Sequence, residues 1–359
     1  MLSLLLSTII ISFIVNYTTL HNKSLNIVTQ FICYVFSVVV ISYAIMERDL
    51  IGDAVNYSNI YFNICNIGYE YPSLGFYLIN LLFCGVGFNA LLFTVPVLGY
   101  CSYLLFIKKD YGYLLPIYFL LITMNISFLQ LNASGIRQGI SISFMIITLA
   151  FLVKGDSFKA LGFGIISTTF HWATLPFLSL LFITVATRNR FSIKHLLVMF
   201  FTVNLGSILG IFEVFSSYAH VFMSNEDKIN AYVEYAAESG YRTGFRLDFF
   251  LYSIVPLLII KLTLWNRFVS NSYFRKILSC YIVLNSAATF LNFIPFSDRM
   301  YAYSWSIIPV LGLYAINEWL KGKEKQEQLF VMISLILMCL FLTSINYNFR
   351  FLVSDILWT

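Results

Sequence analysis

Arg137 is the residue in this sequence whose type and position most clearly suggest chemistry, because it places a permanent charge between two long apolar runs. It belongs to the segment Asn132–Gly139, which follows Leu114–Leu131 and precedes Ile140–Val153. Each run is long enough to lie within a bilayer. A guanidinium there is costly unless it lies at the membrane surface or faces a polar cavity, so Arg137 is a candidate functional residue. Its planar fork of donors matches the oxygens of a phosphate group.

The composition indicates a membrane protein. Of 359 residues, 59% are hydrophobic and 11% are charged, whereas soluble domains carry about 25% charged residues. Apolar runs of helical length recur along the chain, and they predict an all-α polytopic protein with about 12 transmembrane helices, roughly 10 to 14. We expect one membrane domain over residues 1–359, with Met1–Val15 as a retained first helix because it lacks a basic start and a cleavage site.

The basic residues predict the orientation of these helices. Most of the 22 lysines and arginines fall in short loops that we assign to the cytoplasm. Acidic residues lean to the opposite side, which contains two longer outer loops, residues 47–72 and 216–248. Residues 74–88 are too short for a full span followed by another, so we expect a re-entrant or interfacial segment on the outer side. The assigned cytoplasmic loops are Lys108-Lys109, Lys154–Lys159, Arg188–Lys194, Lys261–Lys276 and Lys321–Lys325.

Several polar residues gather on the outer face in this topology. Arg137 begins a helix there, where free backbone N–H groups also favour anions. His171 lies at a turn between two short helices, and it is either a general base or a structural hydrogen-bond donor. Asp298-Arg299 lies at another outer turn. For any single arginine, including Arg242 and Arg246, contact with lipid headgroups is the alternative.

Other nearby residues have two interpretations each. Tyr301, Tyr303 and their neighbours are either sugar-stacking surfaces or part of the aromatic belt of a membrane protein. Gly135 and Gly139 either let a phosphate approach the backbone or permit close helix packing.

The six cysteines show no short paired spacing. Five lie in apolar runs, where we expect small buried thiols, and Cys65 lies in an outer loop without an obvious partner. The scattered histidines and cysteines do not predict a structural metal site.

A set of motifs resembles the EpsG family of membrane polysaccharide polymerases, which are relatives of the Wzy O-antigen polymerases. The motifs span about residues 47 to 305, and the chain departs from the family pattern upstream of Arg137 and at Trp172-Ala173, which leaves the sugars open. They are Gly52-Asp-x-x-x-Tyr57, Glu70-Tyr-x-x-x-Gly75-Phe, Ile136-Arg-Gln138, Phe170-His171 and, more faintly, Asp298-Arg299.

The resemblance implies a membrane glycosyltransferase with a GT-C-like architecture. It would join oligosaccharide repeat units linked to undecaprenyl diphosphate, both donor and acceptor, into O-antigen or a related polysaccharide at the periplasmic face of a bacterial inner membrane. No cofactor or nucleic acid is implied, whereas membrane lipids and a chain-length regulator are implied partners. The catalytic candidates are Arg137, His171, Asp298 and Arg299. The substrate-binding candidates are Asp53, Tyr57, Glu70, Gln138, Arg242, Arg246, Tyr301 and Tyr303.

Two alternatives remain. A single-sugar, lipid-linked glycosyltransferase that uses a metal ion would rely on Glu47, Asp49 and Asp53 as ligands and base. A transporter of lipid-linked oligosaccharides would carry ionisable groups near span midpoints and paired interrupted helices. Most charges in this sequence lie instead at the ends of the predicted spans, apart from Arg137 and Glu213.

Overall fold

The computed structural model describes residues 27–47, 53–107, 114–187, 192–218, 243–263 and 265–320. Every regular element in these ranges is a helix, as predicted for a helical membrane protein. The contacts divide the chain into two compact units. Of the described residues, the first unit contains those up to Leu178 and those from Pro309, and the second contains Ser179–Ile308. The single membrane domain over residues 1–359 stays a prediction.

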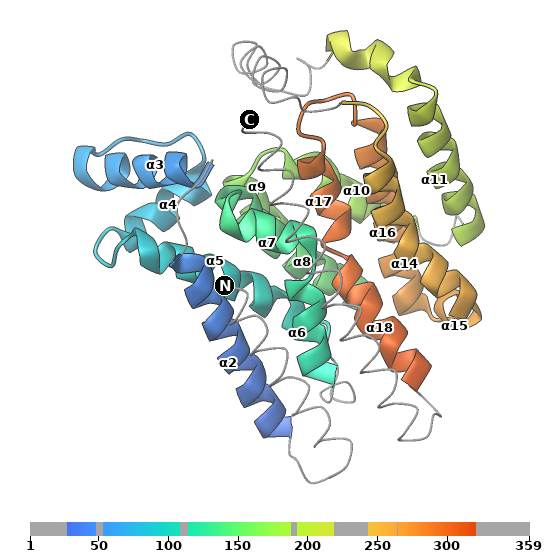
Figure 1. Ribbon diagram of the computed structural model, residues 1–359, viewed down its shortest axis with the longest axis horizontal. Coiled ribbons are helices and arrows are strands. Elements are labelled where there is room, and N and C mark those ends of the chain that lie inside the picture. Colours follow the sequence, from blue (N-terminus) through green and yellow to red (C-terminus); the bar gives the residue numbers. More distant parts are fainter. Residues whose placement is uncertain are drawn as a thin grey trace, which may run out of the picture. The chain divides into compact units, whose positions relative to one another are not determined.

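The first unit is built around α8, which packs against α9, α5 and α7 (Figure 1). Helix α2 packs against α5 and α6, and α4 packs against α3 and α9. Its helices are α2 (Ile27–Met46), α3 (Asp53–Ile67), α4 (Leu74–Phe83), α5 (Phe88–Leu104), α6 (Leu115–Thr123), α7 (Ile126–Ala133), α8 (Ile136–Lys154), α9 (Ser157–Phe170), the start of α10 (Thr174–Ala186) and nearly all of α18 (Ile308–Leu320).

A tight turn makes α8 and α9 an antiparallel hairpin. Gly155 ends α8 with φ 90°, a left-handed conformation that favours glycine. Asp156 then caps α9 by accepting a hydrogen bond from the backbone N–H of Lys159 at 3.1 Å. Its hydrogen bonds with Lys159 hold the pKa of the Asp156 carboxyl below its usual value. Because the turn is so short, the start of α8 and the end of α9 lie at the same end of the hairpin.

Helix α5 runs parallel to α8. Lys154 at the end of α8 donates a hydrogen bond from Nζ to the carbonyl of Leu105 at 2.7 Å, just after the end of α5. The start of α5, and with it the preceding α4, therefore belongs to the end of the unit at which α8 begins. This agrees with the expected placement of residues 74–88 and Lys154 at opposite ends, while Lys108-Lys109 lies outside the described residues.

The predicted run Leu114–Leu131 is two helices rather than one. Helix α6 ends at Thr123 and α7 begins at Ile126. The side chain of Asn125 accepts a hydrogen bond from the N–H of Phe128 at 3.1 Å, so it starts a new helix. By length and apolar composition, α8 is the one helix among the described residues that could cross a membrane. The predicted count of about 12 spans therefore stays a prediction.

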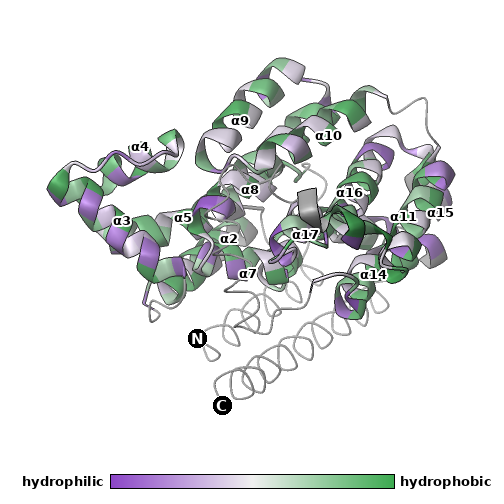
Figure 2. Ribbon diagram, turned by 90° about the horizontal axis from the view of Figure 1, so that it is seen from above, coloured by the Kyte–Doolittle hydropathy of each residue, from purple (hydrophilic) through white to green (hydrophobic). Residues whose placement is uncertain are grey.

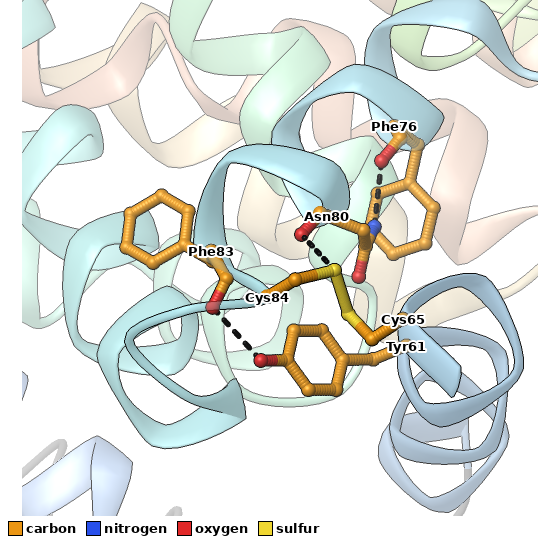
Figure 3. The surroundings of a disulfide bond; sticks show 6 residues. All are labelled: Tyr61, Cys65, Phe76, Asn80, Phe83 and Cys84. Carbon is orange, nitrogen blue, oxygen red and sulfur yellow. Dashed lines mark hydrogen bonds between the residues drawn. A yellow bond between two sulfur atoms is a disulfide. The ribbon is translucent and has the colours of Figure 1, made fainter. Parts of the chain in front are cut away.

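A disulfide bond between Cys65 and Cys84 joins α3 to the turn after α4, with a Cα–Cα distance of 5.4 Å (Figure 3). Beside it, the Tyr61 hydroxyl donates to the carbonyl of Phe83 at 2.8 Å. The expectation that Cys65 has no partner and that Cys84 is a buried thiol is therefore wrong, because the fold of the two helices brings these distant residues together. Cys101 is exposed, against expectation, and Cys280 is buried, as expected.

The second unit is built around α16, which packs against α11, α15 and α17. Figure 2 shows that α10, whose larger part belongs to this unit, consists mostly of hydrophobic residues, whereas α3 mixes hydrophilic and hydrophobic ones. The other elements of this unit are α11 (Ile193–Ile208), the 3-10 helix η2 (Ile211–Tyr218), α14 (Leu247–Thr263), α15 (Trp265–Ser270), α16 (Ser272–Phe290) and α17 (Asp298–Trp305).

Candidate functional site

The guanidinium of Arg137 lies against two tyrosines in the first unit. Its Nη1 donates a hydrogen bond to the hydroxyl oxygen of Tyr71 at 2.6 Å. Its Cζ lies 5.3 Å from the ring centroid of Tyr71 and 6.0 Å from that of Tyr57. The Nε atom is buried and has no hydrogen-bond acceptor among the described residues. A cation over aromatic faces is stabilised, but its donors are left largely unused.

No carboxylate in the described part of the chain forms an ion pair with Arg137. Two ion pairs within the described part join Lys159 to Asp156 and Arg246 to Asp248. A buried or half-buried charge without a counterion is costly, and an anionic ligand would offset that cost. The described surroundings of Arg137 thus suit an anion.

The start of α8 adds to this preference. Arg137 is the second residue of α8, and Gly135 at the N-cap supplies no side-chain hydrogen bond. The first N–H groups of a helix lack partners within it and carry partial positive charge. A Cβ at Gly139 would lie 3.0 Å from the carbonyl oxygen of Leu131, and one at Gly135 would lie 2.9 Å from Leu131 Cδ2. Of the two interpretations of these glycines, close packing of α7 on α8 is the one that these distances favour.

We call residues 71–76 the strap. It begins at Tyr71, includes the first three residues of α4, and packs against the end of α9. The Ser73 hydroxyl lies 2.8 Å from the carbonyl oxygens of both Thr169 and Phe170. A Cβ at Gly75 would lie 2.4 Å from Thr169 Oγ1 and 3.0 Å from the ring of Phe170, so a side chain there would force these neighbours to shift. The strap therefore contacts both the Arg137 side chain and the last residues before His171.

Phe76, fully buried at the end of the strap, supports the aromatic rings around Arg137. Its ring centroid lies 5.3 Å from that of Tyr57 and 5.7 Å from that of Tyr71, both in edge-on contacts. It belongs to one apolar cluster with Ile136 and Phe170, the residues that immediately precede Arg137 and His171. The same core thus fixes the backbone from which the side chains of Arg137 and His171 start.

His171 ends α9 and is half-buried. Its N–H donates to the carbonyl of Ser167 at 3.3 Å, and its carbonyl accepts from the N–H of Thr174 at 3.0 Å. One turn deeper, the Ser141 hydroxyl lies 2.6 Å from that of Thr174 and 3.0 Å from that of Ser167. Since Ser141 follows Arg137 by one turn and Ser167 precedes His171 by one turn, this cluster holds the two at the same level.

The remaining predicted residues of the first unit lie on α3, after it, or beside Arg137. Asp53 begins α3, and Tyr57 on the next turn joins the Arg137 group, as the ring distances show. Glu70 is exposed just before the strap, whereas Gln138 is 4% exposed. Apart from the placement of Tyr57, their roles stay predictions.

In the second unit, Asp298 and Arg299 are the first two residues of α17 and are half-buried. The Cζ of Arg299 lies 5.6 Å from the ring of Phe296, whose φ of 59° is unusual for a residue other than glycine. Such strained backbone clusters at functional sites. Asp298 and Arg299 keep their candidate roles as predictions.

Tyr301 and Tyr303 are only 4% and 0% exposed. Tyr301 stacks on Trp305 with 5.2 Å between ring centroids, and its hydroxyl donates to Thr289 Oγ1 at 3.0 Å. These rings belong to the core of the second unit, so their placement favours neither the sugar-stacking surface nor the aromatic belt. Their substrate-binding role stays a prediction that burial does not support.

Arg246 differs from Arg137 in having a counterion. Its Nε and Nη2 donate to the two carboxylate oxygens of Asp248 at 3.2 and 2.6 Å, and its Cζ lies 3.7 Å from the ring of Phe249. A guanidinium already engaged by both oxygens of a carboxylate has less left to offer a phosphate. Arg242 lies outside the described residues.

A comparison with protein families matches the EpsG family over residues 31–354. The chain belongs to the EpsG family. This membership indicates a membrane protein with a polysaccharide polymerase-like function. No curated protein and no solved structure matches the chain significantly.

The sequence of this EpsG protein did not reveal every residue of the group around Arg137. Tyr71 was recognised only as part of the motif Glu70-Tyr-x-x-x-Gly75-Phe and was not placed among the candidate site residues, and Ser73 was not singled out. The signal that could have found Tyr71 is the expected position of that motif and of Arg137 on the same outer side, because a phenol is one of few neutral acceptors that also stacks on a guanidinium.

Proposed function

We propose that this EpsG protein joins lipid-linked oligosaccharide repeat units into a surface polysaccharide at the outer face of a bacterial inner membrane. The donor is the growing glycan on undecaprenyl diphosphate, and the acceptor is a second lipid-linked unit. The observation that carries this proposal is Arg137, an uncompensated guanidinium in the described structure that begins a helix and lies against the strap leading to His171.

The disulfide supports the outer placement of this site. Disulfides persist in oxidising compartments such as the periplasm and are rare in the cytosol. The Cys65–Cys84 bond ties α3 to the turn after α4, and the strap, which lies between the two cysteines, places Tyr71 against Arg137. It argues for the same orientation as the basic loops, on independent grounds.

In the proposed reaction, the bond between the anomeric carbon of the donor sugar and the diphosphate oxygen breaks. A new bond forms between that carbon and a hydroxyl oxygen of the acceptor, and undecaprenyl diphosphate leaves. Arg137 and the first N–H groups of α8 stabilise the negative charge that develops on the leaving diphosphate. His171 takes the proton of the acceptor hydroxyl. Charge neutralisation by a guanidinium makes a metal ion unnecessary in this scheme.

Replacing Arg137 by lysine tests the proposal. A lysine keeps the positive charge but cannot form a planar pair of hydrogen bonds with two phosphate oxygens. We expect glycan ladders from cells carrying Arg137→Lys to collapse toward single repeat units, with the protein still in the membrane. Arg275→Lys is the matched control, since Arg275 is also half-buried but lies in the segment Lys261–Lys276 that we assign to the cytoplasm, and it should leave the ladder intact. A normal ladder from Arg137→Lys would refute the proposal.

His171→Ala tests the general base separately. With the imidazole gone, the turn between α9 and α10 keeps its backbone hydrogen bonds, so the protein should fold and polymer synthesis should fall. Unchanged synthesis would move the role to a carboxylate such as Asp53 or Asp298.

The metal-using alternative relies on Glu47, Asp49 and Asp53, and no group of three metal-ligating side chains gathers among those residues that the structure describes. Glu47 and Asp53 lie at the end of α2 and the start of α3, and Asp49 lies outside the described residues. Loss of polymer synthesis by purified protein on chelation of divalent cations would favour this alternative.

One observation favours the transporter alternative. Helix α7 is separated from α6 by a break at Asn125, and α17 is separated from α18 by a turn at Ser306-Ile307. Interrupted helices in two parts of a chain are typical of secondary transporters. Purified protein in vesicles distinguishes the two functions: a polymerase lengthens the glycan, whereas a transporter moves unchanged lipid-linked units across the bilayer.

A further inference from the structure

The hydroxyl of Tyr71 has two roles available, and the described structure uses one of them. Its oxygen accepts the hydrogen bond from Arg137 Nη1 at 2.6 Å. A phenol also has one proton to donate. A hydrogen bond from a cation to the phenol oxygen polarises the O–H bond and makes that proton a better donor.

We propose that Tyr71 and Arg137 form one anion-binding pair, in which Tyr71 donates its hydroxyl proton to an oxygen of the same phosphate group that the guanidinium binds. This deepens the proposed function and rests on it for the identity of the lipid diphosphate. Tyr71 thereby contacts the ligand directly and also fixes the guanidinium, whose Nε has no acceptor among the described residues.

The strap fixes the position of the Tyr71 hydroxyl. Ser73 is bonded to two main-chain carbonyls at the end of α9, and Gly75 packs directly against Thr169. The ring of Tyr71 also contacts Phe76, which is fully buried. With its backbone held on one side and its ring on the other, the phenol oxygen loses little entropy when a ligand binds, which raises its contribution to affinity.

The test uses Tyr71→Phe, which removes the hydroxyl and keeps the ring. Tyr69→Phe is the matched control, because Tyr69 undergoes the same change two residues away and is 48% exposed. Full-length proteins in nanodiscs are titrated with farnesyl diphosphate, with farnesol as the probe that lacks phosphate. We expect Tyr71→Phe to weaken diphosphate binding about tenfold to a hundredfold, the effect of one hydrogen bond to a charged group. Farnesol binding should be unchanged.

A double-mutant cycle with Arg137→Lys measures whether the pair acts as a unit. We expect the double variant to bind diphosphate no more weakly than Arg137→Lys alone. Additive losses, or wild-type binding by Tyr71→Phe, overturn the proposal. Thermal unfolding of each variant reveals any loss of fold, and a Tyr71→Phe protein that binds farnesol normally is folded at the site. If Tyr71→Phe weakens the binding of farnesyl diphosphate as expected but the wild-type protein makes no polymer, the pair stands and the proposed function fails.

Discussion

Removing the disulfide should loosen the α3–α4 segment by an amount that follows from its position in the chain. Cys65 and Cys84 are separated by 19 residues. Closing a loop of that length lowers the entropy of the opened chain by an amount worth about 3 kcal/mol at room temperature. Since each 1.36 kcal/mol is tenfold in an equilibrium constant, Cys65→Ala/Cys84→Ala should raise the population of opened α3–α4 roughly 200-fold.

Hydrogen exchange measured by mass spectrometry in nanodiscs is the assay. Amides of α3 and α4 should exchange faster in the double variant by about the predicted factor, while those of α8 serve as the internal reference. Cys101→Ala is the matched control, because Cys101 is an exposed free thiol. Polymer synthesis should fall as well, since the strap lies within this segment, between the two cysteines. Unchanged exchange in α3 and α4 would refute the reasoning, because tertiary packing alone would then hold the segment.

Three further variants test separate contacts. Gly75→Ala would place a methyl group 2.4 Å from Thr169 Oγ1, so it should cost about 1–3 kcal/mol of folding free energy and lower the unfolding temperature. Gly85→Ala is the control, because a methyl group there would meet nothing within 4 Å. Equal unfolding temperatures for the two variants would contradict this expectation. Ser141→Ala removes the hydroxyl that links α8 to α9 and α10, and a thermal assay should show a loss of about 0.6–2 kcal/mol; no shift would mean that the cluster is not a clamp. Asn285→Ala deletes the fully buried amide that donates to Ser253 and Ser304, and denaturant unfolding should show a loss of about 1–3 kcal/mol; wild-type stability would contradict it.

The helical secondary structure of the chain and the approximate ends of α8 could be predicted from the sequence. The apolar run Ile140–Val153, closed by Lys154-Gly155, indicated a helix with Arg137 near its start, and α8 begins at Ile136 and ends at Lys154. The short basic turn after it indicated an antiparallel partner that ends near His171. Both predictions rest on local signals, apolar length and turn residues, which act within a few residues of one another.

Features that depend on side-chain partners could not be predicted in this way. An apolar run does not reveal the break at Asn125. The capping hydrogen bond of Asn125 is favoured over a continuous helix only when the surrounding chain is already in place. Pairing of Cys65 with Cys84 requires α3 and α4 to fold side by side. The aromatic residues after Arg299 have the sequence pattern expected either for a surface belt or for a core. Only the tertiary packing places Tyr301 and Tyr303 in the core.

The anchoring of the strap also determines which substitutions this site can accept. Ser73 bonds to main-chain carbonyls at residues 169 and 170, and every amino acid supplies a carbonyl. Thr169 can therefore be exchanged for another residue of similar or smaller size without losing the anchor, whereas Ser73 and Gly75 cannot. In a saturation library across residues 69–76 and 166–173, we therefore expect few functional substitutions at Ser73 and Gly75 and many at position 169.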